Sequence, residues 1–170
     1  METSFFFHPR MVHLPLGIGV VMPLLAGGLL AAWWTGWLPR RAWLVAVLLQ
    51  AILVGSGFVA VRAGEAEEDL VEKVVPRNVI HEHQEAGEHF VQAAAAVLVV
   101  MAIALALRRW GLAVAALATI GTLVVFYLGL QAGKLGGALV YEHGAAQVYT
   151  AAPGRLPTTP GEAVTPPPER

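Results

Sequence analysis

The sequence predicts an all-α integral membrane protein, a four-helix bundle with both termini outside. Lys, Arg, Asp and Glu are absent from four stretches: residues 11–39, 42–61, 89–107 and 110–133. Each stretch supplies the roughly 20 residues that a helix needs to cross about 30 Å of hydrocarbon. The composition agrees, because 56% of the residues are hydrophobic and only 14% are charged. A soluble bundle would need polar outer faces, which these stretches do not offer.

The four charge-free stretches define one membrane domain over residues 1–150. Its transmembrane helices are predicted near residues 12–37, 42–62, 89–107 and 111–133. Pro15 suits the opening turn of the first helix, where its missing N–H would have no partner, and Pro23 predicts a kink. The fourth helix is expected to continue outward to about residue 143, because its apolar pattern runs past Lys134.

Two further segments have a composition of their own. Residues 67–75 predict a short amphipathic helix on the outside, which ends before Pro76. The Pro-rich residues 151–170 predict an extended, disordered tail.

The basic residues predict the orientation. The two short loops between helices carry Arg40, Arg41, Arg108 and Arg109 and no acidic residue. By the positive-inside rule both loops face the cytoplasm. Both termini and a long, acidic loop over residues 63–88 then lie on the periplasmic or extracellular side of a bacterial inner membrane. The net charge of −1 gives no reason to expect nucleic-acid binding, and the absence of Cys excludes disulfides and thiolate metal sites.

Every histidine falls on the predicted outer side of the four helices. The six residues are His8, His13, His81, His83, His89 and His143. The densest group lies in the segment 81–89, where His and Glu alternate. Neutral imidazole supplies a lone pair for a metal, and a carboxylate either ligates the metal or orients a ring, so this pattern is typical of a metal site. A solvated loop can have the same composition.

The two ends of the helical region resemble a known family. The opening motif is His-Pro-x-x-Val-His-x-Pro at residues 8–15, and the closing motif is Gly-Gly-x-Leu-Val-Tyr-x-His-Gly at residues 136–144. In this order, with four helices between them, they resemble an uncharacterised bacterial family of predicted four-helix membrane proteins, domain of unknown function 2231. Members often occur near c-type cytochromes, which implies a redox setting. The resemblance points to His8, His13, His89 and His143.

Together these features predict a b-type cytochrome with haem at the outer face. A bis-histidine haem needs two imidazoles at one depth, with small residues that make room for the porphyrin. We expect His13 to pair with His89 in a deeper site, and His143 to pair with His83 or His8 in an outer one, so that one or two haems are bound. Gly136 and Gly137 are expected to leave space for the cofactor. Electrons would pass between membrane quinol, or a larger respiratory complex, and a periplasmic carrier such as a c-type cytochrome.

Two other functions fit the same residues. One is a non-haem metal site, in which His81, His83 and His89 bind copper or zinc, or in which glutamates favour iron. The other is a cofactor-free membrane anchor or interaction subunit whose histidines titrate near neutral pH. A stand-alone enzyme is less favoured, because the spacing matches neither a zincin helix nor the Glu-x-x-His repeat of di-iron bundles.

Overall fold

The computed structural model describes residues 8–150, and this part of the chain is helical with no strand. Its helices are α1 (His8–Met11), α2 (His13–Trp34), the 3₁₀ helix η1 (Arg40–Trp43), α3 (Leu44–Val71), α4 (Arg77–Ala106), α5 (Gly111–Tyr141) and α6 (Gln147–Thr150). Four of the helical segments are long and apolar enough to cross a membrane. The predictions of an all-helical structure, over residues 8–150, and of four helices long and apolar enough to cross a membrane are therefore confirmed. The predicted tail over residues 151–170 lies outside the described residues.

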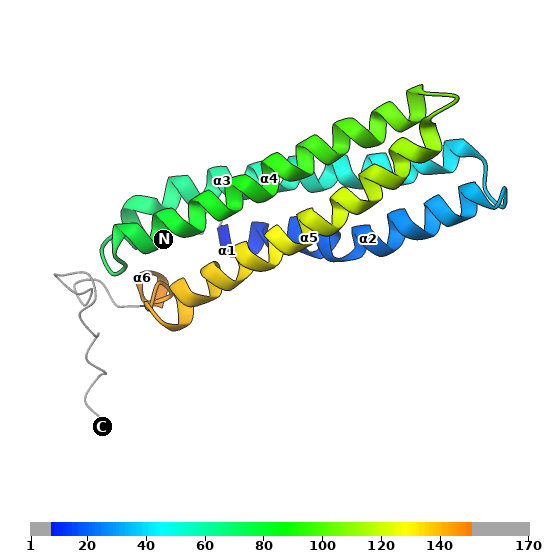
Figure 1. Cartoon of the computed structure of the whole chain (residues 1–170). Coiled ribbons are helices and arrows are strands. Elements are labelled where there is room, and N and C mark those ends of the chain that lie inside the picture. Colours follow the sequence, from blue (N-terminus) through cyan, green and yellow to red (C-terminus); the bar gives the residue numbers. More distant parts are fainter. Residues whose placement is uncertain (1–7, 151–170) are drawn as a thin grey trace.

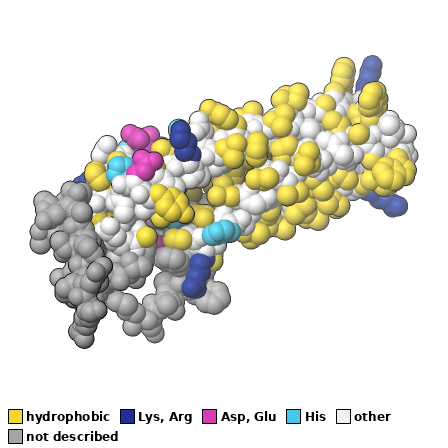
Figure 2. All heavy atoms as spheres, turned by 90° about the horizontal axis from the view of Figure 1, so that it is seen from below, with side chains coloured by type: hydrophobic (Ala, Val, Ile, Leu, Met, Phe, Trp, Pro, Cys, Tyr) yellow, Lys and Arg dark blue, Asp and Glu magenta, His cyan; other side chains and the backbone are white. Residues whose placement is uncertain are grey.

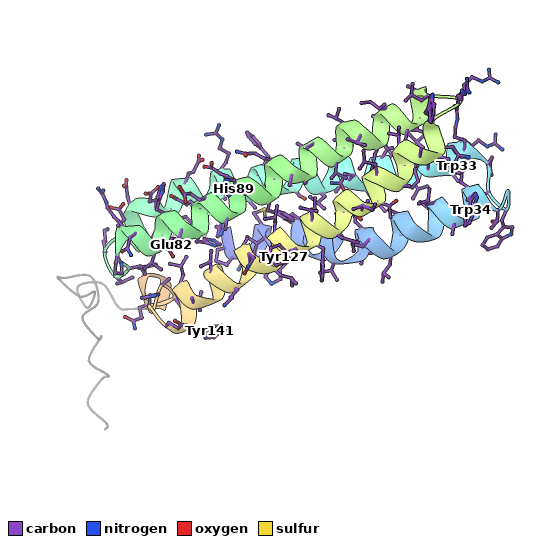
Figure 3. The ribbon with its side chains drawn as sticks, in the orientation of Figure 1. Trp33, Trp34, Glu82, His89, Tyr127 and Tyr141 are labelled. Atoms are coloured by element: carbon purple, nitrogen blue, oxygen red, sulfur yellow. The ribbon has the colours of Figure 1, made fainter. Side chains whose placement is uncertain are left out.

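The long helices lie side by side along one axis (Figure 1). Helix α2 contacts α3 and α5, and α4 contacts the same two helices. The α2–α3 and α4–α5 connections meet at one end of the molecule, which carries Arg40, Arg41, Arg108 and Arg109 and which we call the arginine end. The α3–α4 connection and the end of α5 lie at the other, which we call the histidine end. Figure 3 shows Trp33 and Trp34 near the arginine end, and Glu82 and Tyr141 near the histidine end.

Small residues bring the long helices close together. The fully buried core includes Ala26, Ala46, Ala94, Ala104 and Ala115. A Cβ atom added at Gly57 would lie 2.9 Å from the Val91 side chain, and one added at Gly121 would lie 2.7 Å from that of Val97. Such close approach is typical of membrane helices, which associate by packing because lipid is as apolar as they are.

Apolar side chains cover the outside of the molecule along most of its length (Figure 2). Leu24 is 81% exposed and Leu117 is 61% exposed. The charged side chains gather toward the two ends (Figure 2). This distribution is the one that a lipid environment requires, because hydrocarbon solvates the apolar belt and water solvates both ends.

The long loop predicted over residues 63–88 is wrong, as is the separate short helix over 67–75. Helix α3 continues to Val71 and α4 begins at Arg77, so only residues 72–76 connect them. The residues involved are mostly Ala, Glu and other good helix formers, and Pro76 precedes α4 with an extended ψ of 138°. A small core of Val74, Val75, Ile80, Leu139 and Ala145 closes this end.

Helices α3, α4 and α5 are longer than a bilayer is thick. They contain 28, 30 and 31 residues, which correspond to about 42–47 Å at 1.5 Å per residue. The hydrocarbon core is only about 30 Å thick. The charge-free part of α4 begins at residue 89, so the segment 77–88 projects beyond the membrane-spanning part at the histidine end.

Candidate functional site

Two histidines that are far apart in the sequence meet at the histidine end. His8 begins α1, which packs against α3, and His83 lies in the projecting part of α4. Their ring centroids are 5.9 Å apart and the ring planes stand at 83°. Both side chains are partly buried. Of the six histidines, these are the two in ring contact with each other within residues 8–150.

Each of these imidazoles lies against a glycine of another helix. A Cβ atom at Gly64 of α3 would lie 3.0 Å from Nδ1 of His8, and one at Gly136 of α5 would lie 3.0 Å from Cε1 of His83. The space that Gly136 leaves is therefore filled by an imidazole. Gly137 has no atom within 4 Å of its Cβ position.

A backbone carbonyl fixes the protonation pattern of His8. Its Nδ1 is 2.8 Å from the carbonyl oxygen of Ala60. Because a carbonyl only accepts, Nδ1 must carry the hydrogen, and Nε2 of a neutral ring is left with the lone pair. A hydrogen bond from one ring nitrogen to a carbonyl is the usual support of a histidine that binds a metal through its other ring nitrogen. The backbone N–H of His8 also donates to Oε1 of Glu67 at 3.3 Å.

The surroundings of His83 disfavour its charged form. Burial lowers the pKa of His83, since a poorly solvated site disfavours the imidazolium, and the nearby His8 lowers it further. The carbonyl of Ala132 acts in the opposite direction. The buried Nδ1 of His83 has no hydrogen-bond partner. An unpartnered buried nitrogen is costly unless a ligand or a proton donor reaches it.

Other polar side chains at this end contact one another. His81 lies 3.2 Å from Glu85, Arg77 donates to both carboxylate oxygens of Glu72, and Gln84 donates to Glu68 at 2.8 Å. Within the described part of the chain, no group of three or more His, Asp or Glu is arranged to hold a metal ion.

The other predicted ligands lie apart from the pair. His13 opens α2 and is exposed, and His143 follows α5, where its N–H donates to the carbonyl of Ala138 at 3.1 Å. His89 is also exposed and lines a groove between α4 and α5 together with Tyr127 and Gln131. Figure 3 shows His89 and Tyr127 on these two helices.

Sequence reasoning named both members of the pair without joining them to each other. It also missed Ala60 and Gly64, which support His8. These two residues are four positions apart, so they lie on one face of α3. That spacing is a weak signal, because alanine and glycine recur throughout the helices.

Comparison of the chain with models of protein families, with curated proteins and with solved structures finds no match.

Proposed function

We propose that this chain is a membrane-bound b-type cytochrome whose haem is ligated by His8 and His83. The observation that carries the proposal is the pair itself. Two imidazoles from separate helices meet, one with Nδ1 bonded to a carbonyl and the other buried with a free nitrogen. In this proposal, His8 and His83 take the place of the two pairs expected from the sequence. Those pairs were His13 with His89, and His143 with His83 or His8.

The number of protein ligands favours haem over a bare ion. A structural zinc ion takes four protein ligands and a catalytic one takes three. Haem iron receives four nitrogens from the porphyrin and needs only two axial ligands from the protein. The described residues offer His8 and His83 and no larger donor cluster. Two imidazoles are therefore enough for the axial positions of haem iron but too few for a zinc ion.

Room for a macrocycle has to come from movement of His8. The rings touch, and both Gly64 and Gly136 are already covered by an imidazole. Helix α1 continues through Val12, whose backbone is in the αR conformation, into α2, so His8 would have to move with this first turn. This movement would lengthen the 2.8 Å contact between Nδ1 of His8 and the Ala60 carbonyl of α3, while α4 would still hold His83.

The bound haem would supply one-electron redox chemistry. The site lies at one end of the molecule, so the rest of a roughly 30 Å hydrocarbon core has no redox centre from this chain. The protein therefore acts on one side of the membrane. We propose that it passes electrons between quinol, or a larger redox complex, and a soluble carrier such as a c-type cytochrome.

The same proposal includes the orientation. The arginine end faces the cytoplasm of a bacterial cell, because its loops carry four arginines and no acidic residue. The histidine end and both termini then face the periplasm.

A visible spectrum tests the proposal. The detergent-purified chain, produced under haem-sufficient conditions, is expected to give a sharp low-spin b-type signal in the reduced-minus-oxidised difference. His8→Ala and His83→Ala should each abolish it, because one axial ligand is lost. His81→Ala is the matched control, since this exposed side chain pairs with Glu85 outside the pair.

Three results would contradict this assignment. Absence of haem from the wild-type chain would exclude a cytochrome, and metal analysis of the same sample would then test for a bare ion. Loss of the signal in His13→Ala and His89→Ala, with the signal retained in His8→Ala and His83→Ala, would show that His13 and His89 are the ligands, as expected from the sequence. Loss of the signal in His81→Ala to the same extent as in His8→Ala and His83→Ala would show that the loss reflects folding and not the removal of a ligand.

A further inference from the structure

A second candidate site, independent of the histidine pair, surrounds Lys134 on α5. Two grooves run along the outside of α5, one on each side of Lys134, and this residue lines both of them. One groove separates α5 from α4 and the other separates it from α2. Lys134 is exposed and forms no ion pair with the residues the structure describes.

The groove toward α4 carries hydrogen-bond donors. It has a volume of about 420 Å³ and is lined by His89, Tyr127, Gln131 and Lys134 among apolar residues. Gln131 donates to the hydroxyl oxygen of Tyr127 at 2.8 Å. This bond leaves the Tyr127 hydroxyl hydrogen and the second amide hydrogen of Gln131 free to donate. An anion beside Lys134 would thus meet a cation and several neutral donors.

The groove toward α2 is apolar. It has a volume of about 370 Å³, and Gly19, Gly129 and Gly133 lie along it. The edge of the Phe90 ring forms its floor, because Cβ atoms at Gly19 and Gly129 would lie 3.5 and 3.1 Å from that ring. A Cβ atom at Gly133 would meet nothing within 4 Å. The groove extends from Lys134 to Phe126, which is toward the middle of the membrane-spanning part of α5.

We infer that this pair of grooves binds one anionic phospholipid. The phosphate would lie beside Lys134, within reach of the donors in the first groove, and an acyl chain would lie in the second groove over Phe90. Lys134 alone could be explained as a lysine that extends to the membrane surface. The donor-lined groove and the apolar groove lie on the two sides of α5 and share this lysine, so one molecule with an anionic group and an apolar chain can contact both.

Lipid retention tests this inference. The full chain is reconstituted in nanodiscs with equal amounts of phosphatidylglycerol and phosphatidylcholine, extracted in mild detergent, and examined by native mass spectrometry. We expect one phosphatidylglycerol molecule to be retained. Lys134→Gln should lower its occupancy about three- to tenfold, because it removes a charge-assisted contact. Lys73→Gln is the matched control, since Lys73 is exposed elsewhere at the histidine end.

The apolar groove is tested by filling it. Gly133→Leu should displace the acyl chain and lower retention, whereas Gly137→Leu should not. Both glycines lie in α5 with open space at the Cβ position, but only Gly133 lines the groove. Excess inorganic phosphate should not displace the lipid, because the acyl chain in the apolar groove also contributes to binding.

Several outcomes would overturn the inference. Retention of both lipids in proportion to their abundance would indicate annular lipid only. Unchanged retention in Lys134→Gln or Gly133→Leu would exclude the assigned grooves, and displacement by inorganic phosphate would indicate a simple anion site. None of these results depends on haem, so the two proposals can fail separately.

Discussion

Histidine and glycine act in pairs at the histidine end. His8 lies on Gly64, and His83 lies on Gly136, so a methyl group at either glycine would press on an imidazole. Gly136 and Gly137 are adjacent in one helix, but only the first is covered. Identical substitutions at these two positions therefore separate an effect on His83 from an effect on helix propensity.

We expect Gly136→Ala to destabilise the protein relative to Gly137→Ala. Alanine favours a helix over glycine by about 1 kcal/mol at either site. At residue 136 the added Cβ lies 3.0 Å from His83, and displacing a packed ring costs about 1–3 kcal/mol. Thermal unfolding in detergent should give the lower midpoint for Gly136→Ala. Equal midpoints would show that His83 moves away without cost.

At the scale of single residues, the sequence predicted which residues belong to the outer site better than it predicted which of them contact each other. His8, His83 and Gly136 were all predicted to belong to the outer site. The pairing was not predictable, because it depends on where the four-residue α1 lies against α3. Short segments carry no periodicity from which such a position can be inferred.

The interface between α4 and α5 depends on close approach at single positions. Gly121 of α5 faces Val97 of α4, which is 8% exposed. The two helices also contact each other along much of their length (Figure 1). In a membrane such packing replaces the hydrophobic effect as the force that holds helices together.

Gly121→Ala should therefore loosen this interface. Its Cβ would lie 2.7 Å from a methyl group of Val97, and overpacking of this kind costs about 1–3 kcal/mol. Val97→Ala should restore much of the loss, because it removes the atoms that collide. Unfolding of both single variants and of the double variant forms a double-mutant cycle. Additive effects would show that the two residues do not interact.

Among the elements, the charge-free stretches were predicted well and the polar ones were not. The first and fourth helices begin and end within a few residues of their predicted positions. Residues 63–88 were expected to form a loop because they are rich in charge. Charge indicates that a segment lies outside the hydrocarbon, but it does not oppose a helix when the charged residues are mostly Glu, a good helix former.

At the scale of the whole molecule, the two ends differ in charge. The arginine end carries four arginines in its two connections, and the histidine end carries most of the acidic residues. We expect a reporter that is active only in the periplasm to function when fused after residue 150. The same reporter inserted between Arg108 and Arg109 should be inactive. The reverse pattern would invert the proposed orientation and place the histidine pair on the cytoplasmic side.

The short connections also have a consequence for biosynthesis. Helices α2 and α3 are joined at the arginine end, and so are α4 and α5, which makes the chain two successive helical hairpins. Each hairpin can enter the bilayer as a unit while its basic turn stays behind. In the proposed orientation, the acidic stretch around residues 65–88 is carried across between them, as both termini are. In the proposed orientation, these acidic residues are delivered to the compartment where His83 meets His8.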